Sequence, residues 1–231
     1  MKQIILSLIL SLSMTISCFA SDTKLDTFWK TVLTGKEIPT LSTDAGTPLE
    51  IYKYGKYGVL LGTGFGSMNF KKSDGQYIIT FNDSEKLKNS IKTHNEALGM
   101  IREQVRGVSA DLDGIKCLFV KLTNKEYLYD YNKYGWDSGW LVLKENTGIC
   151  NGYARVFSEM LDELGIENYY IEGRLKNNGL HAWNAFVLDG KTYTVDATHA
   201  STYKGTDKIW NYFKEDGSMT LGDGRKVLNK Y

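Results

Sequence analysis

The chain has 231 residues with 28 basic and 27 acidic side chains, so its formal net charge is only +1. A balance this close to neutrality argues against nucleic acid or an anionic membrane surface as the main partner. With 23 glycines, 15 tyrosines and 2 prolines, the composition is typical of a globular protein without low-complexity linkers.

The N-terminus predicts an export signal. Lys2 precedes an apolar run over residues 4–16, and small residues follow before Asp22. This pattern is typical of a secretory signal peptide cleaved after Ala20, and the run is too short to span a bilayer comfortably as a retained anchor. Lipidation at Cys18 is a second alternative, although the residues before it match the lipidation signal poorly. We therefore expect a secreted or extracytoplasmic protein of bacterial type.

Removal of residues 1–20 takes away Lys2 alone among the charged side chains, which leaves 27 basic and 27 acidic residues. The remaining length, about 210 residues, fits one domain with an appendage or two small domains. Only Cys117 and Cys150 remain, and two cysteines of an exported protein can pair. Because Cys117 lies in an apolar segment, 115–120, we expect it to be a buried free thiol.

Residues 21–82 predict an N-terminal helix and a small β-unit, whose role is left open between recognition, a cover over a cleft and a fold extension. Apolar residues recur at helical spacing over 23–36. The glycine-rich stretch 62–67 lacks the lysine and the spacing of a phosphate-binding loop, so it is interpreted as a connection between strands. Three segments have strand composition, separated by glycines: 49–54, 57–61 and 76–81.

Residues 83–231 predict the larger domain. It begins with two helical segments, over 83–106 and 110–127, followed by an irregular segment over 127–140 that is rich in aromatic residues and glycine. No metal site and no cofactor is predicted, because metal-ligand spacing is absent from the three histidines, His94, His181 and His199.

Residues 147–154 read TGICNGYA and begin a predicted helix. From Cys150 to Leu164 the apolar residues follow helical spacing, and Gly165 ends the run as a C-cap. Residues 146–147 are the predicted N-caps. Cys150 would then lie in the first helical turn, where the positive end of the helix favours a thiolate. The alternative is a small buried cysteine without reactivity.

Residues 181–198 predict a β-hairpin that turns at 189–190, an Asp-Gly pair. The register that follows from this turn places His181 opposite Thr198. His181 and Asp196 then share one face of the sheet, with a diagonal separation of about 7–8 Å between backbones. A carboxylate and an imidazole can hydrogen-bond over this separation. Taken singly, the alternatives are a capping or surface histidine and a carboxylate that stabilises a turn.

Cysteine, histidine and aspartate are the residue types of a nucleophilic site. A thiol is a poor nucleophile at neutral pH unless a base takes its proton, and the base needs a group to orient it. The carboxylate of Asp196 would fix the ring tautomer of His181 and stabilise the imidazolium formed when Cys150 loses its proton.

The three motifs together resemble the transglutaminase-like superfamily, whose core resembles that of papain. They are GICNGYA at 148–154, HAWN at 181–184 and YTVDAT at 193–198. The resemblance implies an α+β fold in which a helix bearing the cysteine packs on an antiparallel sheet bearing the histidine and the aspartate. It implies Cys150 as nucleophile, His181 as general base and acid, and Asp196 as the orienting carboxylate.

The chain departs from this pattern just after Asp196. Many bacterial members continue Asp-x-Thr-Trp-Asp, whereas residues 196–200 read DATHA. The departure leaves the triad intact and puts the usual substrate contacts there in doubt. His199 has the opposite parity to His181 in the predicted strand, so we expect it at the rim. Trp136 and Trp140 are the candidates for a second oxyanion donor, and the residues expected to contact substrate are Trp140, Tyr153 and Trp183.

The resemblance implies a thiol enzyme that acts on amide bonds of proteins or peptides through a thioester, which water or an amine then resolves. Hydrolysis, deamidation and cross-linking stay open. Peptide of the cell wall is a reasonable substrate for an exported protein of this type, and no nucleic acid or metal partner is expected. The alternative function is a protein- or peptide-binding module that keeps the fold without the chemistry.

Overall fold

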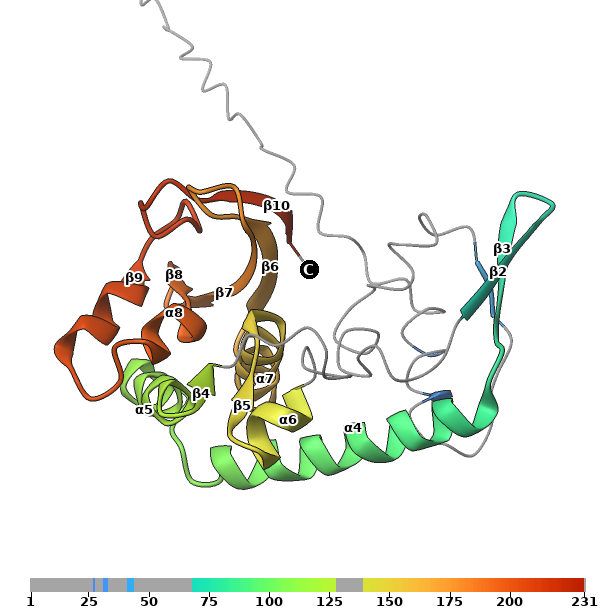
Figure 1. The fold of residues 1–231 in the computed structure, drawn as a ribbon, viewed down its shortest axis with the longest axis horizontal. Helices are drawn as coiled ribbons and strands as arrows, with labels where there is room; N and C mark the ends of the chain where they lie inside the picture. The colour runs from blue at the N-terminus through green and yellow to red at the C-terminus, as the bar shows by residue number, and fades with distance from the viewer. Residues whose placement is uncertain (1–26, 28–30, 33–40, 44–67, 128–138, 231) are drawn as a thin grey trace, which may run out of the picture.

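The computed structural model describes residues 27, 31–32, 41–43, 68–127 and 139–230. Helices cover one face of a five-stranded antiparallel sheet, and a three-stranded sheet lies at the far end of one long helix (Figure 1). None of the helices in this part of the chain combines the length and the apolar character needed to cross a membrane. The signal peptide predicted over 1–20 lies outside the described residues and stays a prediction.

The three-stranded sheet has the order β1-β3-β2 and is antiparallel throughout. The strand predicted over 76–81 is confirmed, while its hairpin partner over 68–73 was missed because two lysines and a serine end that segment. The strands predicted over 49–54 and 57–61 lie outside the described residues, as does most of the helix predicted over 23–36. The strands are β1 (Leu41–Thr43), β2 (Met68–Ser73) and β3 (Gln76–Phe81).

Two capped helices follow, as predicted. Helix α4 (Ser84–Val105) begins after Asp83, whose side chain accepts from the backbone N–H of Lys86. Helix α5 (Leu112–Thr123) begins after Asp111 in the same way and ends earlier than predicted. Each cap satisfies a backbone donor that a helix start leaves without a partner.

Cys117 corrects one expectation. Its thiol is free, as expected, but it is exposed on the outward face of α5. Ile115, Leu118 and Phe119 are the residues of this segment that enter the core. An apolar segment of a helix has one face toward solvent, and Cys117 lies on that face.

Helix α7 (Cys150–Glu163) is the central helix of the larger unit. Its apolar face is buried against the sheet and the neighbouring helices, including α6 (Gly139–Lys144). Gly165 ends it with φ +71°, as the C-cap prediction requires. The predicted N-caps are wrong. Residues 147–148 instead form β5 (Thr147–Gly148), which pairs in parallel with β4 (Glu126–Tyr127), so Ile149 takes the cap position without a side-chain bond.

The five-stranded sheet has the order β10-β6-β7-β8-β9. Leu188 pairs with Lys191 across the turn, which confirms the predicted hairpin register. Its inner face contributes Phe186, Tyr193 and Val195 to the main core beneath α7. The mixed helix and sheet architecture is the α+β fold expected from the sequence. The strands are β6 (Asn168–Arg174), β7 (Leu180–Leu188), β8 (Lys191–Val195), β9 (Phe213–Glu215) and β10 (Lys226–Lys230).

The second hairpin strand is shorter than predicted. It ends at Val195, and Asp196 caps the short helix α8 (Ala197–Ser201) by accepting from the backbone N–H of His199. Thr198 therefore does not face His181 across the sheet. An aspartate that can bond the backbone three residues on favours a helix start over a continued strand. The 3₁₀ helix η2 (Asp207–Tyr212) then leads into β9.

The buried His94 on α4 should make the folding stability sensitive to acid. Its ring is 2% exposed and neither ring nitrogen has a hydrogen-bond partner. Burial lowers its pKa from 6.5 to about 4. As the pH falls through this interval the unfolded chain binds a proton before the folded one, so stability should drop by about 3 kcal/mol. Urea unfolding at about pH 7 and about pH 4 should show this loss in the wild type and not in His94→Leu. Equal losses in both proteins would contradict the prediction.

Candidate active site

Cys150 is the first residue of α7, in a small cluster formed by Ala154 and two strand residues, Tyr170 and Ala182. It is partly buried, and its thiol lies 3.6 Å from Oδ1 of Asn151. The helix start arises locally, because β5 fixes the approach of the chain and the apolar face of α7 anchors the turns after Cys150 in the core. The thiol therefore lies at the positive end of a helix, as expected.

His181 links the thiol to the carboxylate. It is 8% exposed, its Nε2 lies 2.9 Å from Oδ2 of Asp196, and the thiol of Cys150 is near enough to influence its pKa. Burial alone would lower the pKa of His181. The charge of Asp196, its hydrogen bond and the contact with Cys150 outweigh burial and raise this pKa to about 10. The three residues predicted to form a triad therefore lie together, with Nδ1 of the ring left for the thiol.

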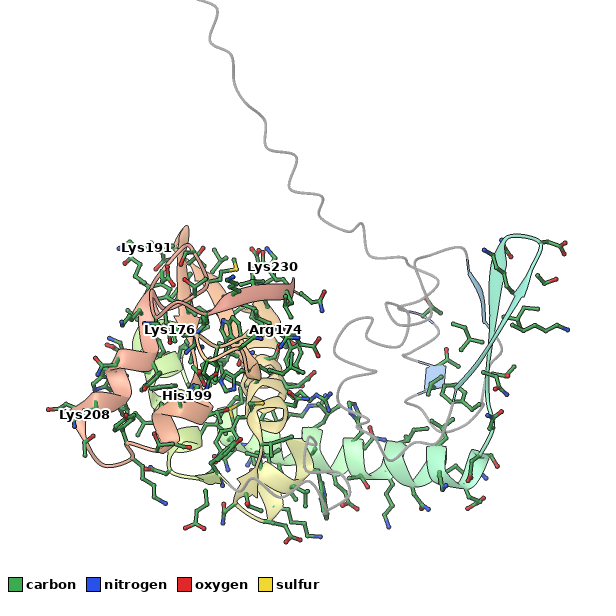
Figure 2. All side chains as sticks on the ribbon, turned by 45° about the horizontal axis from the view of Figure 1, so that its top comes forward. Arg174, Lys176, Lys191, His199, Lys208 and Lys230 are labelled. Atoms are coloured by element: carbon green, nitrogen blue, oxygen red, sulfur yellow. The ribbon has the colours of Figure 1, made fainter. Side chains whose placement is uncertain are left out.

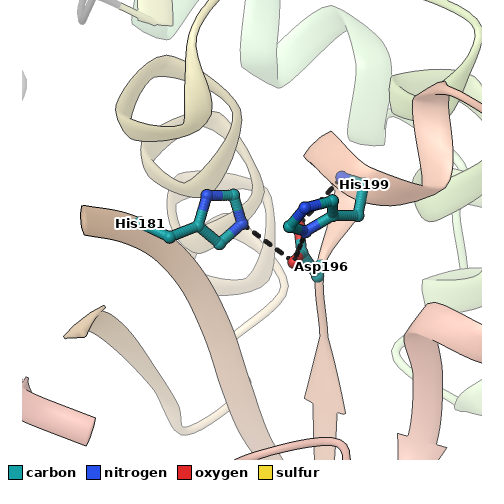
Figure 3. A group of neighbouring side chains, drawn as sticks. All are labelled: His181, Asp196 and His199. Atoms are coloured by element: carbon teal, nitrogen blue, oxygen red, sulfur yellow. Dashed lines mark hydrogen bonds and ion pairs between the residues drawn. The ribbon is translucent and has the colours of Figure 1, made fainter. Parts of the chain in front are cut away.

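Asp196 is fully buried and receives more donors than the prediction gave it. Its Oδ1 accepts from the backbone of His199, and its Oδ2 accepts from His181 and from Nδ1 of His199 at 2.6 Å (Figure 3). Burial acts to raise the pKa of this carboxyl, but the charges and hydrogen bonds of the two histidines hold it well below 3.8. The side chain is thus a carboxylate that only accepts hydrogen bonds.

The expectation that His199 lies only at the rim is wrong. Strand parity does not apply to His199, because the chain leaves the strand before it and turns into α8. The first turn of α8 brings His199 back to Asp196, the residue that caps this helix. The rings of His181 and His199 have centroids 4.5 Å apart. Because both rings must donate to the same carboxylate, the neutral form of His199 carries its lone pair on Nε2. Its ring stacks on Tyr212 with centroids 5.6 Å apart.

Arg225 is a third side chain on this carboxylate, and the sequence analysis did not find it. It precedes β10, and its Nη1 lies 2.9 Å from Oδ2 of Asp196. Its other nitrogens bond Asp223, and its guanidinium lies over the ring of Trp183 at 4.9 Å. No motif surrounds Arg225, and it is 29 residues away from its partner in sequence.

Gly173 allows this packing. It pairs with His181 across β6 and β7. A β-carbon at this position would lie 2.2 Å from the carbonyl of Lys226 and 2.3 Å from the ring of Trp183. Only a residue without a side chain lets β10 and the indole ring approach β6 so closely. The glycine therefore supports the surface on which Arg225 rests.

A hollow of about 270 Å³ lies beside the carboxylate. His199 and Lys176, both labelled in Figure 2, belong to its wall. Cys150 does not line it, so the hollow reaches the site from the side of His199 rather than from the side of the thiol. The other wall residues are Leu175, Asn177, Tyr212, Asp223 and Arg225.

The two histidines and Asp196 have ligand atoms within 4.8 Å of one another, a grouping that the sequence spacing did not suggest. Two observations disfavour a metal ion here. The guanidinium of Arg225 already places a fixed positive charge on the carboxylate oxygen. Each ring also places one nitrogen within hydrogen-bond distance of that oxygen, and an ionised carboxylate can accept there only from an N–H group. We therefore interpret the group as a hydrogen-bonded cluster, and the absence of a metal stays a prediction.

The residues expected to contact substrate are placed less favourably. Tyr153 is 0% and Trp183 1% exposed, so both side chains are core residues in this structure. Trp140 on α6 is half-buried, and its indole N–H donates to Glu96 on α4. Trp136 lies outside the described residues. Substrate contact by Tyr153 and Trp183 stays a prediction that their burial does not favour.

One comparison with known families agrees with the resemblance in sequence. Residues 99–197 match the family model of the transglutaminase-like superfamily. Similar solved structures include a TGase, with 18% sequence identity and a TM-score of 0.42. The match covers 62% of this chain and 47% of the TGase chain. A candidate cysteine protease from Cytophaga hutchinsonii is 15% identical, with a TM-score of 0.38. That match covers 59% of this chain and 49% of the protease chain. The chain thus spans about half the length of each. The search of curated proteins gave no match.

Proposed function

We propose that this chain is a thiol enzyme acting on amide bonds of proteins or peptides, because residues 99–197 match the family model of the transglutaminase-like superfamily, which generally includes cysteine-dependent enzymes. The observation that carries the proposal is the hydrogen bond of one imidazole, His181, to a buried carboxylate, with the thiol of Cys150 near enough to raise the pKa of that imidazole. This is the arrangement that nucleophilic catalysis by cysteine requires.

In the first half-reaction, His181 holds the proton of Cys150, and the thiolate attacks the carbonyl carbon of the amide. The C–N bond then breaks as His181 gives its proton to the departing nitrogen, which leaves as ammonia or an amine. The product on the enzyme is a thioester. Asp196 stabilises the imidazolium before this proton transfer and keeps the ring in the tautomer that serves it.

In the second half-reaction, water or an amine attacks the thioester while His181 takes its proton. The thiolate leaves, and the acid or the new amide is released. The negative charge on the carbonyl oxygen lies near the start of α7, where the first N–H groups of a helix have no carbonyl to bond. We assign these backbone groups as the first oxyanion donors.

The proposed substrate class and location of the enzyme rest on the sequence. The signal-like residues 1–20 support an exported enzyme, and cell-wall peptide is the substrate that we propose for it. Hydrolysis or amide exchange is the reaction that we favour, with water or an amine as the acceptor.

The pH dependence of iodoacetamide labelling at Cys150 tests this proposal without knowledge of the substrate. The wild type should react rapidly well below the ordinary thiol pKa of about 8.5, because the imidazolium stabilises the thiolate. His181→Ala should lose this low-pH reactivity. Mass spectrometry locates the label and separates it from any label on Cys117, which is exposed.

A slow reaction that follows an ordinary thiol titration in both proteins would contradict the enzyme assignment and favour the binding module. Labelling that appears only after reduction would show that Cys150 is held in a disulfide.

A further inference from the structure

The segment between β9 and β10 is held in place by hydrogen bonds within its turn and to the five-stranded sheet. The carboxylate of Asp216 accepts from the backbone N–H groups of Thr220 and Leu221 and so closes the turn. The indole N–H of Trp183 donates to the carbonyl of Met219. Beyond the turn, β10 pairs with β6. The segment therefore brings Arg225 to one defined position.

Arg225 occupies that position at a cost that only its partners can offset. Its side chain is 0% exposed, and a buried guanidinium is unfavourable unless it is paired and hydrogen-bonded. Nη1 of the guanidinium faces the side chain of Asp196, which is also 0% exposed. Nη2 faces the side chain of Asp223, which is 43% exposed. The pair with Asp196 is thus wholly buried, and the pair with Asp223 reaches the surface.

The positive charge of Arg225 matters most at the step in which His181 loses its proton. When His181 has given its proton to the leaving group, its ring no longer places a positive charge beside Asp196. Burial then favours protonation of the carboxyl, which would cost it the ability to hold the ring. Arginine does not lose its proton in proteins, so Arg225 supplies a positive charge to Oδ2 that does not change through the cycle.

We propose that Arg225 is a positioning residue of the Cys150 site that keeps the Asp196 carboxylate ionised and turned toward His181. The inference rests on the function proposed above. The charged and titratable groups that face this carboxylate are the two histidines, Arg225 with its partner Asp223, and Tyr212.

Full-length Arg225→Met tests the proposal through the lower pH limit of rapid Cys150 labelling. Removal of a positive charge raises the pKa of every group near it, so this limit should move to higher pH by on the order of one unit. Arg225→Lys restores a charge and should return the limit toward the wild type. Lys176→Met removes an equal charge from the wall of the same hollow, where it is exposed to solvent. This matched control should leave the limit unchanged.

An unchanged lower pH limit of labelling in a folded Arg225→Met protein that has lost only thermal stability would overturn the proposal. If that variant does not fold, the comparison moves to Asp196→Asn with and without Arg225→Met. The proposal requires Arg225→Met to reduce stability much less in the Asp196→Asn protein than in the wild type. An equal loss of stability in both proteins would overturn it. A wild type without rapid labelling at low pH contradicts the proposed enzyme itself, which separates that failure from a failure of the role of Arg225.

Discussion

Replacement of Cys150 by alanine is expected to abolish amide turnover, with a loss in kcat/KM on the order of 10⁴-fold or more. The thiol is the atom that forms the thioester in the proposed mechanism, and no other group can form it. The residue is partly buried at the edge of a small cluster with Ala154, Tyr170 and Ala182, so its loss should change the unfolding temperature little. The assay is release of ammonia or amine from a panel of glutamine donors and peptides on which the wild type is active.

The chain supplies a matched control in a second cysteine, Cys117. Cys117 is a free thiol on the exposed face of α5, so Cys117→Ala should keep wild-type turnover. Cys150→Ser tests the chemistry rather than the shape, because a hydroxyl in the same place is far less ionised than a thiol. Turnover that survives Cys150→Ala would place the nucleophile elsewhere, and a large loss in Cys117→Ala would show that the effect is not specific to the site.

The parts of the site that could be predicted are those fixed by local pattern. Apolar spacing defined α7, and a two-residue turn fixed the register of β7 and β8. The register of β7 and β8 was enough to predict that His181 and Asp196 lie on the same side of the sheet. Their contact is made by a cap rather than by a strand, yet the direction of the side chain is the one that pleat parity predicted.

The parts that could not be predicted depend on choices made outside their own segment. A continued strand and a helix start were both compatible with residues 195–199, and the capping bond of Asp196 decided between them. That decision also brought His199 onto the carboxylate. Arg225 is placed by the turn around Asp216 and by the pairing of β10 with β6, and no local spacing points to it.

Asp196→Asn is expected to lower both activity and stability, because one carboxylate holds three cationic or donor side chains. An amide carries no charge and cannot stabilise the imidazolium, so turnover should fall by about 10³- to 10⁴-fold. The buried guanidinium of Arg225 loses its buried partner, which should reduce the free energy of unfolding by about 3 to 5 kcal/mol. Asp189→Asn is the matched control. Asp189 is an exposed turn residue with φ 51°, a conformation that asparagine also adopts.

The pH dependence of this loss has a definite sign. The carboxylate contributes above its ordinary pKa of 3.8, and its stabilisation is lost as the pH falls through the lower pKa of the folded protein. The pKa of His181 is raised from 6.5 to about 10, so the contribution of its imidazolium is complete below 6.5 and is lost as the pH rises toward 10. The deficit of Asp196→Asn should therefore be largest at about pH 5 and smaller at about pH 9 in urea unfolding. A deficit that is constant across this range would mean that His181 is neutral in the folded protein, and the thiolate–imidazolium pair on which the proposed chemistry depends would have to be abandoned.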